Sequence, residues 1–244
     1  MDLTTQIRTT LKSQFFLIPS TTWTATLTSR VPTPPLPSLI ATAKARLLAS
    51  DLTTPGLLDE SSTGSLPARL LSPETPETIL PHDVPCQVLD IENLSLSRWE
   101  QVEELEAVAR GEQTTGRRIV RLAAEESEYD NVDEGGVGVV LGRPPQQQQQ
   151  QQQRRNATHR LVLQDCKGQK IYAMELRRME NIGTGSTNIG EKVVLKSGTV
   201  IARGMVLLEP EKCVMLGGKI DAWQRAWVEG RMARLKEVVG AERS

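Results

Sequence analysis

The chain has 244 residues, enough for one large domain or two small ones, and its 29 basic and 30 acidic side chains give a net charge of −1. A protein that holds nucleic acid mainly by neutralising phosphates carries a basic excess, so this balance argues against that class. Three scattered cysteines and two distant histidines argue against a disulfide framework and a metal site. We expect neither a membrane span nor a secretory signal, because no long apolar run is present.

The N-terminal region has the apolar spacing of short helices. A first helix is predicted to end at Pro19, a second to begin after a cap at Ser20 or Thr21, and a third to come after the proline-rich linker 31–37. Residues 1–52 therefore predict a three-helix bundle, and so small a bundle is expected to pack on the C-terminal part of the chain. The predicted inward residues are Leu3, Ile7, Leu11, Trp23, Leu27, Ile40, Ala43, Leu47 and Leu48.

The middle of the chain is poor in regular patterns. Residues 53–83 hold five prolines among serines and threonines and predict a loosely ordered connector. Residues 86–96 have the composition of a strand, and 99–110 fit a short charged helix. Six acids lie within 125–134, and a run of eight glutamines comes after them. We interpret 97–158 as a partly disordered insertion, because such segments bury too little to offset the entropy of ordering them.

Strand patterns return after the insertion. Residues 161–216 predict a β-hairpin and further strands, with Gly204 as a bulge or bend, and a final helix begins near Asp221. Five short strands with a long insertion between the first and the second are typical of an OB-type barrel. The predicted fold class is α+β: a three-helix bundle packed on a five-stranded OB-type barrel with an inserted loop and a C-terminal helix. The barrel domain is predicted to span 84–240.

Three stretches of this domain stand out: LQD with AME at 173–175, GMVLLEPE at 204–211, and LGGKID at 216–221. In their order and spacing they resemble the RecQ-mediated genome instability protein 1 family. The N-terminal helices, with Trp23 after a short turn and LLASD at 47–51, are similar to the small helical domain of that family. The resemblance covers roughly 1–52, 84–122 and 159–235.

The resemblance implies a non-enzymatic partner of topoisomerase III and of a RecQ-type helicase, acting in the nucleus on double Holliday junctions and on decatenation. In that family the insertion between the first two OB strands reaches the topoisomerase gate. We therefore expect the chain to bind topoisomerase III through the OB domain and to modulate its gate through 97–158. DNA is expected to bind weakly or through the complex. The resemblance implies no cofactor, no metal, no membrane and no small-molecule substrate.

Partner contacts are predicted in two places. In the insertion, two adjacent apolar residues are flanked by arginines, and arginine is favoured at protein interfaces. The alternative is that this stretch is only a solvated spacer. These residues are Arg117, Ile119, Val120 and Arg121. In the barrel, the predicted contacts lie in the stretches that carry the resemblance, and they are Met174, Glu175 and Pro210.

Two other functions remain open from the sequence. A direct single-stranded-DNA-binding OB protein would present several stacking rings, whereas Tyr172 is the one aromatic residue in 159–222. Basic side chains that could form a weak phosphate path, or simply a solvated face, are Lys167, Lys170, Arg177, Arg178, Lys192 and Lys196. A hydrolase would need a histidine beside a nucleophile, and neither His82 nor His159 has such a context. We therefore expect no enzymatic activity.

Overall fold

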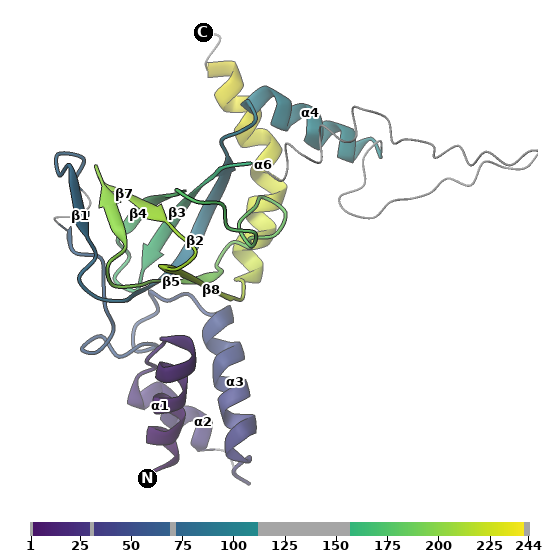
Figure 1. Ribbon diagram of the computed structural model, residues 1–244. Helices are drawn as coiled ribbons and strands as arrows, with labels where there is room; N and C mark the ends of the chain where they lie inside the picture. Colours follow the sequence, from purple (N-terminus) through teal and green to yellow (C-terminus); the bar gives the residue numbers. More distant parts are fainter. Residues whose placement is uncertain (1, 30–31, 69–71, 112–156, 242–244) are drawn as a thin grey trace, which may run out of the picture. The chain divides into compact units, whose positions relative to one another are not determined.

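The computed structural model describes residues 2–29, 32–68, 72–111 and 157–241. The chain divides into two compact units, one of Met1–Ser95 with Ala157–Arg231 and the other of Leu96–Asn156 with Met232–Ser244. The first unit holds three N-terminal helices and a curled sheet (Figure 1). The α+β class is as predicted.

Three helices open the chain, and they are α1 (Leu3–Phe15), α2 (Thr21–Thr28) and α3 (Leu36–Ala49). Ser20 caps α2 as predicted, because its hydroxyl accepts the backbone N–H of Trp23. Helix α1 ends before Pro19: Phe16 adopts a left-handed conformation and its N–H bonds the Lys12 carbonyl, which closes the helix. Helix α3 begins inside the predicted linker, since a proline is tolerated in a first helical turn.

The core of the helical domain extends beyond the helices. It contains the predicted residues Ile7, Leu11, Leu27, Ala43 and Leu47. Leu57 and Leu58, from the segment predicted as a connector, complete this core, and Pro19 forms a β-bridge with Leu58. Arg8 of α1 pairs with Asp59 just beyond. The chain therefore stays ordered past the last helix.

Eight strands form one sheet in the order β1-β6-β7-β4-β3-β2-β5-β8 (Figure 1). They are β1 (Glu77–Ile79), β2 (Val84–Asn93), β3 (His159–Asp165), β4 (Lys170–Glu175), β5 (Lys192–Leu195), β6 (Val200–Ala202), β7 (Met205–Leu208) and β8 (Cys213–Gly217). Neighbouring strands are antiparallel except for β4 and β7, which are parallel. The predicted β-hairpin is the β3–β4 pair. The sheet has eight strands where the sequence predicted five.

Two features account for two of the three extra strands. Strand β1 lies within 53–83 and pairs with β6, and Leu66 and Leu80 from the same segment are buried in the barrel core. Arg203 and Gly204 both have positive φ and form a two-residue turn that pairs β6 with β7. Hairpin turns with positive φ at both central residues suit the twist of the strands. Gly204 therefore belongs to a chain reversal, and the predicted bulge or bend is corrected.

Two more helices are described, α4 (Arg98–Ala109) and α6 (Asp221–Ala241). A capping box of Ser97 and Glu100 starts α4, where the sequence predicts a short charged helix. Trp223 and Trp227 of α6 pack against the barrel core. Within the described residues, no helix is long and apolar enough to cross a membrane.

The helical domain packs on the barrel, as predicted. The side chain of Gln87, buried on β2, accepts the N–H of Leu52 at 3.0 Å and donates to Asp51 at 2.6 Å. It also donates to Gln164 on β3 at 3.1 Å. Beside this group lies Lys192, fully buried on β5, where burial lowers the pKa of its amine to about 8 although Asp51 and Glu191 act in the opposite direction. Lys192 is thus no part of a solvated or phosphate-binding face.

Candidate partner-binding surface and the root of the insertion

The outer face of strands β3, β4 and β7 carries a group of partly exposed apolar side chains. Side chains alternate along a strand, so that Leu161, Ala173 and Val206 lie in the core and the residues between them face outward. The outward residues are Val162, Tyr172, Met174, Met205 and Leu207. Strand register pairs Val162 with Tyr172, Tyr172 with Met205, and Met174 with Leu207. This group is termed the open face.

A charged pair borders the open face and orients its one aromatic ring. Arg160 of β3 stands 5.0 Å from the ring centre of Tyr172 and also pairs with Glu92 of β2. Tyr172 nevertheless remains 50% exposed. Exposed apolar groups with a polar rim are typical of protein contacts, and Met and Tyr are enriched in interface cores. A single ring is a poor platform for stacking successive bases.

The sequence-predicted contact residues have different positions. Met174 lies on the open face, and Pro210 is exposed just after β7. Glu175 faces inward with a side chain that is 2% exposed, so the prediction of a partner contact there is corrected. Its carboxylate instead bonds groups inside the barrel. The remaining predicted contacts lie outside the described residues, and they are Arg117, Ile119, Val120 and Arg121.

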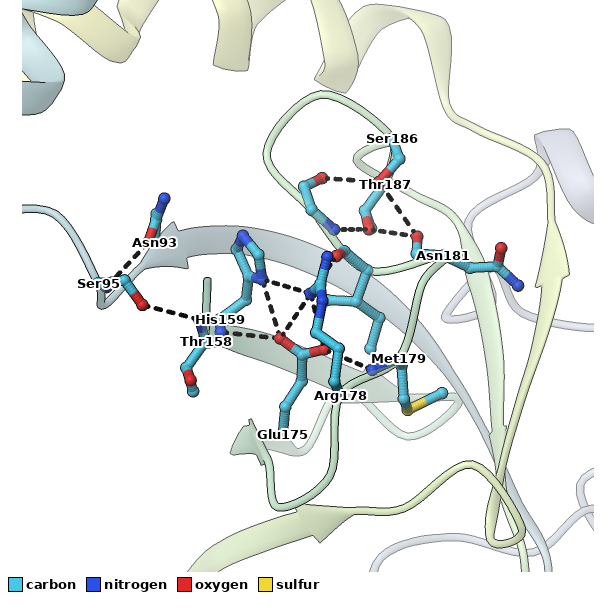
Figure 2. Close-up of polar contacts among 12 residues, drawn as sticks. Asn93, Ser95, Thr158, His159, Glu175, Arg178, Met179, Asn181, Ser186 and Thr187 are labelled. Atoms are coloured by element: carbon cyan, nitrogen blue, oxygen red, sulfur yellow. Dashed lines mark hydrogen bonds and ion pairs between the residues drawn. The ribbon is translucent and has the colours of Figure 1, made fainter. Parts of the chain in front are cut away.

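The insertion leaves and re-enters the barrel at one place, between β2 and β3 (Figure 2). Asn93 and His159 form the last register pair of these strands. Pairing continues beyond them, because the Leu94 N–H donates to the Thr158 carbonyl at 2.8 Å and the Thr158 N–H donates to the Ser95 hydroxyl at 2.9 Å. Residues 93–95 and 157–159 are termed the root. The two ends of the insertion are therefore held side by side.

Three ionisable side chains lie next to the root: His159, Glu175 and Arg178, termed the root cluster (Figure 2). One carboxylate oxygen of Glu175 accepts the His159 N–H at 2.9 Å and stands 2.9 Å from His159 Nδ1. The other accepts the Met179 N–H at 2.9 Å. Arg178 Nη1 donates to the Glu175 carboxylate at 3.1 Å and to the Ile182 carbonyl at 3.0 Å. The cluster thus joins β3, β4 and the segment after β4.

The electrostatics of Glu175 favour its ionised form. Burial by itself would raise the pKa of this carboxyl. Hydrogen bonds from the His159 ring and from the backbone N–H groups of Met179 and His159 outweigh that effect and hold the pKa below its ordinary value. The buried carboxylate is therefore a fixed acceptor for two backbone segments.

The segment after β4 is a compact loop. The Thr187 hydroxyl accepts the Gly183 N–H at 3.1 Å and donates to the Asn181 carbonyl at 3.2 Å (Figure 2). Ile182 and Ile189 anchor the loop in the barrel core. The hydroxyls of Ser186 and Thr187 therefore bond to the backbone of their own loop.

The sequence contains a signal for the root cluster that our prediction missed. His159 alternates in phase with the buried Leu161 and Leu163, and Glu175 with the buried Ile171 and Ala173. Two polar residues at inward positions of paired strands predict a buried polar contact. The neighbouring glutamine tract instead suggested an exposed edge for His159, and the charge of Glu175 suggested a surface.

The other basic and titratable residues named from the sequence have local partners where the structure describes them. Arg177 pairs with Glu211, and Arg178 belongs to the root cluster, so neither extends a phosphate path. The His82 ring nitrogen lies 3.2 Å from the backbone carbonyl oxygen of Ser65. A carbonyl oxygen is not a nucleophile that a histidine activates. Within the described ranges no group of three or more His, Cys, Asp or Glu residues is placed to hold a metal.

Comparison with known proteins gives matches over most of the chain. The family model "RMI1, N-terminal helical domain" matches residues 11–55, and "RMI1, N-terminal OB-fold domain" matches residues 66–231. RecQ-mediated genome instability protein 1 of Schizosaccharomyces pombe is 26% identical over 188 residues, which cover 76% of this chain and 74% of that protein. The predicted OB type of the barrel is thereby confirmed. The match begins near Leu66, in agreement with the burial of that residue in the barrel core.

Proposed function

The chain belongs to the RMI1 family, and from this we propose that it is a non-catalytic accessory subunit of a RecQ helicase–topoisomerase III complex in the nucleus. It binds topoisomerase III through the OB domain and modulates the gate of that enzyme through the insertion. The outcome is double Holliday junction dissolution, decatenation and genome stability. The name of the S. pombe relative, which joins RecQ to genome instability, supports the general role.

The observation that carries the binding part of the proposal is the open face. Its apolar side chains come from three adjacent strands and stay partly exposed. Fully burying a Leu or Met side chain contributes roughly 1.5–3 kcal/mol, so a few such residues provide an anchor of useful affinity. Arg160 and Glu92 supply a polar rim.

The gate effect arises from differential binding. A subunit shifts an equilibrium between open and closed gate states only by the difference in its affinity for the two states. A tenfold shift needs about 1.4 kcal/mol of such difference. The apolar pair Ile119–Val120 and its flanking Arg117 and Arg121 are our proposed source of that difference in the insertion.

A second function, direct binding of single-stranded DNA, has one supporting observation. Tyr172 and Arg160 place a ring and a guanidinium together on the outer face. The absence of further aromatic residues on the described strands β3, β4 and β7 makes this the weaker candidate.

Reconstitution with purified topoisomerase III tests the proposal. We expect the chain alone to show no ATP hydrolysis and no DNA cleavage, relaxation or unwinding, but to increase decatenation when the topoisomerase is present. Replacing Arg117, Ile119, Val120 and Arg121 with Ser and Gly should keep binding and reduce this increase. Intrinsic ATPase or relaxation activity that survives rigorous purification would overturn the proposal. Equal stimulation by the substituted chain would remove the role of these four residues.

A further inference from the structure

The root cluster buries charge where the chain does not need it for folding. The side chains of His159 and Glu175 are 4% and 2% exposed. Buried ionic groups contribute little net stability compared with apolar side chains of similar volume, because both charges lose their hydration. Stability alone therefore does not account for three ionisable residues at this place.

The cluster adds side-chain bonds between strands β3 and β4, which are already paired, and extends them to the loop after β4. The Glu175 carboxylate gathers the backbone N–H of His159, at the end of the insertion, and that of Met179, after β4. Arg178 adds the carbonyl of Ile182. From there the compact loop continues to Ile189, whose N–H donates to the Gln224 side chain of α6 at 2.6 Å. The loop thus has hydrogen bonds to the root cluster at its start and to α6 at its end.

We propose that the root cluster is a positioning element that fixes the returning end of the insertion, at His159, against strand β4 and the loop after it. This inference rests on the proposed function, because it requires that barrel and insertion act on one partner. The open face includes Met174, the residue next to Glu175, and is bordered by Arg160, the residue next to His159. The same two strands therefore carry the open face outward and the root cluster inward.

The physical advantage of such an element is preorganisation. A partner that contacts both the open face and the insertion must order whatever connects them, and ordering costs about 1–2 kcal/mol per residue of backbone. A root that is already rigid removes this cost for its own residues.

Hydrogen exchange tests whether the cluster holds the root. Glu175→Gln keeps the shape but leaves one carbonyl oxygen for two N–H donors, so one backbone donor loses its partner. We expect the amides of Thr158 and His159 to exchange about tenfold faster, which corresponds to the loss of one such bond. Glu92→Gln is the matched control. It removes the ion pair between Glu92 of β2 and Arg160 of β3, which lies outside the cluster. Unchanged exchange at the root in Glu175→Gln would overturn the proposal.

Stimulation of topoisomerase III, measured at saturating concentrations of the chain, tests the positioning role itself. We expect Glu175→Gln to bind with nearly wild-type affinity through the open face and to lose roughly tenfold in stimulation, as expected for a site that must be preorganised. Leu163→Ala, a core variant that lowers the melting temperature without touching the cluster, should stimulate normally below its melting temperature. If Glu175→Gln stimulated the topoisomerase as well as the wild-type chain does, the positioning role would be contradicted and the proposed function would not. A wild-type chain that neither binds nor stimulates would contradict the proposed function.

A milder variant guards against misfolding. His159→Asn removes the imidazole while the Glu175 carboxylate keeps both backbone N–H groups. We expect root exchange and stimulation to change in the same direction as in Glu175→Gln but by only about threefold, since a single side-chain bond is lost. Faster root exchange with undiminished stimulation in this variant would likewise overturn the positioning role.

Discussion

The outer face of the sheet has two halves with opposite chemistry. Over β2 and β5, Gln87 and Lys192 are covered and fully buried, and Gln87 meets polar partners from the helical domain. Over β3, β4 and β7, Tyr172 and its apolar neighbours are only partly covered. In the covered half, hydrogen bonds between polar groups fix the position of the helical domain on the barrel. The open half keeps apolar surface that no described part of the chain covers completely. Such surface is typical of a site that binds another protein.

The largest effect we predict concerns pH and the covered half. The pKa of Lys192 is lowered from 10.5 to about 8 in the folded chain, so between these values the unfolded chain binds more protons. The contribution of Lys192 to the free energy of unfolding should therefore rise as pH increases from 8 to 10.5, by at most about 3 kcal/mol. The buried thiols of Cys86 and Cys213, whose pKa values are raised by burial, contribute in the opposite direction above pH 9, so the contribution of Lys192 is the difference between the wild-type chain and Lys192→Met. Denaturant melts at several pH values measure this, and Lys192→Met should lack the rise. A variant with an unchanged pH profile would show that Lys192 is not the source.

A somewhat smaller effect is expected from the buried amide of the covered half. Gln87→Ala leaves the Leu52 N–H and the Asp51 carboxylate without their partner, which should lower the free energy of unfolding by about 2 kcal/mol. Gln164→Ala removes only the partly exposed end of the same contact and should cost less than about 1 kcal/mol. Chemical denaturation compares the two. Equal losses would mean that the helical domain does not depend on Gln87.

The smallest effect concerns DNA on the open half. Binding of single-stranded DNA at near-physiological salt should be weak, and Tyr172→Ala should weaken it by no more than about threefold, because one ring supplies little stacking. Fluorescence titration over a range of salt concentrations measures both quantities, with Val228→Ala on α6 as a control at another exposed apolar position. Nanomolar affinity that disappears in Tyr172→Ala would instead establish the alternative function.

Local patterns predicted much of the fold. The Ser20 cap, the helix that begins at Arg98 and the β3–β4 hairpin each depend on neighbours within a few residues. Strand β1 was missed because three residues carry too little pattern and pair with a distant strand. The burial of Lys192 was also missed. The lysines of KVVLK are typical of a strand with a solvated face, and only the packing of the helical domain buries Lys192.

The candidate site was predicted only in part. Met174, predicted as a contact from the family resemblance, lies on the open face, and its contact with a partner stays a prediction. Glu175, its neighbour, was predicted as a partner contact from the same resemblance, although its side chain is buried. Its partners are a histidine sixteen positions earlier and an arginine in the loop after β4. Only the three-dimensional arrangement reveals that His159 and Glu175 are buried together and that the exposed Arg178 reaches the same carboxylate.

The central claim is that the open half binds topoisomerase III, and one affinity measurement tests it directly. Met174→Glu with Leu207→Glu places two carboxylates at adjacent positions of the open face. Val228→Glu places one at an exposed apolar position on α6. The account predicts that calorimetric affinity for purified topoisomerase III falls at least tenfold in the double variant, or about 1.4 kcal/mol, and stays unchanged in the control. Wild-type affinity in a folded double variant would contradict it.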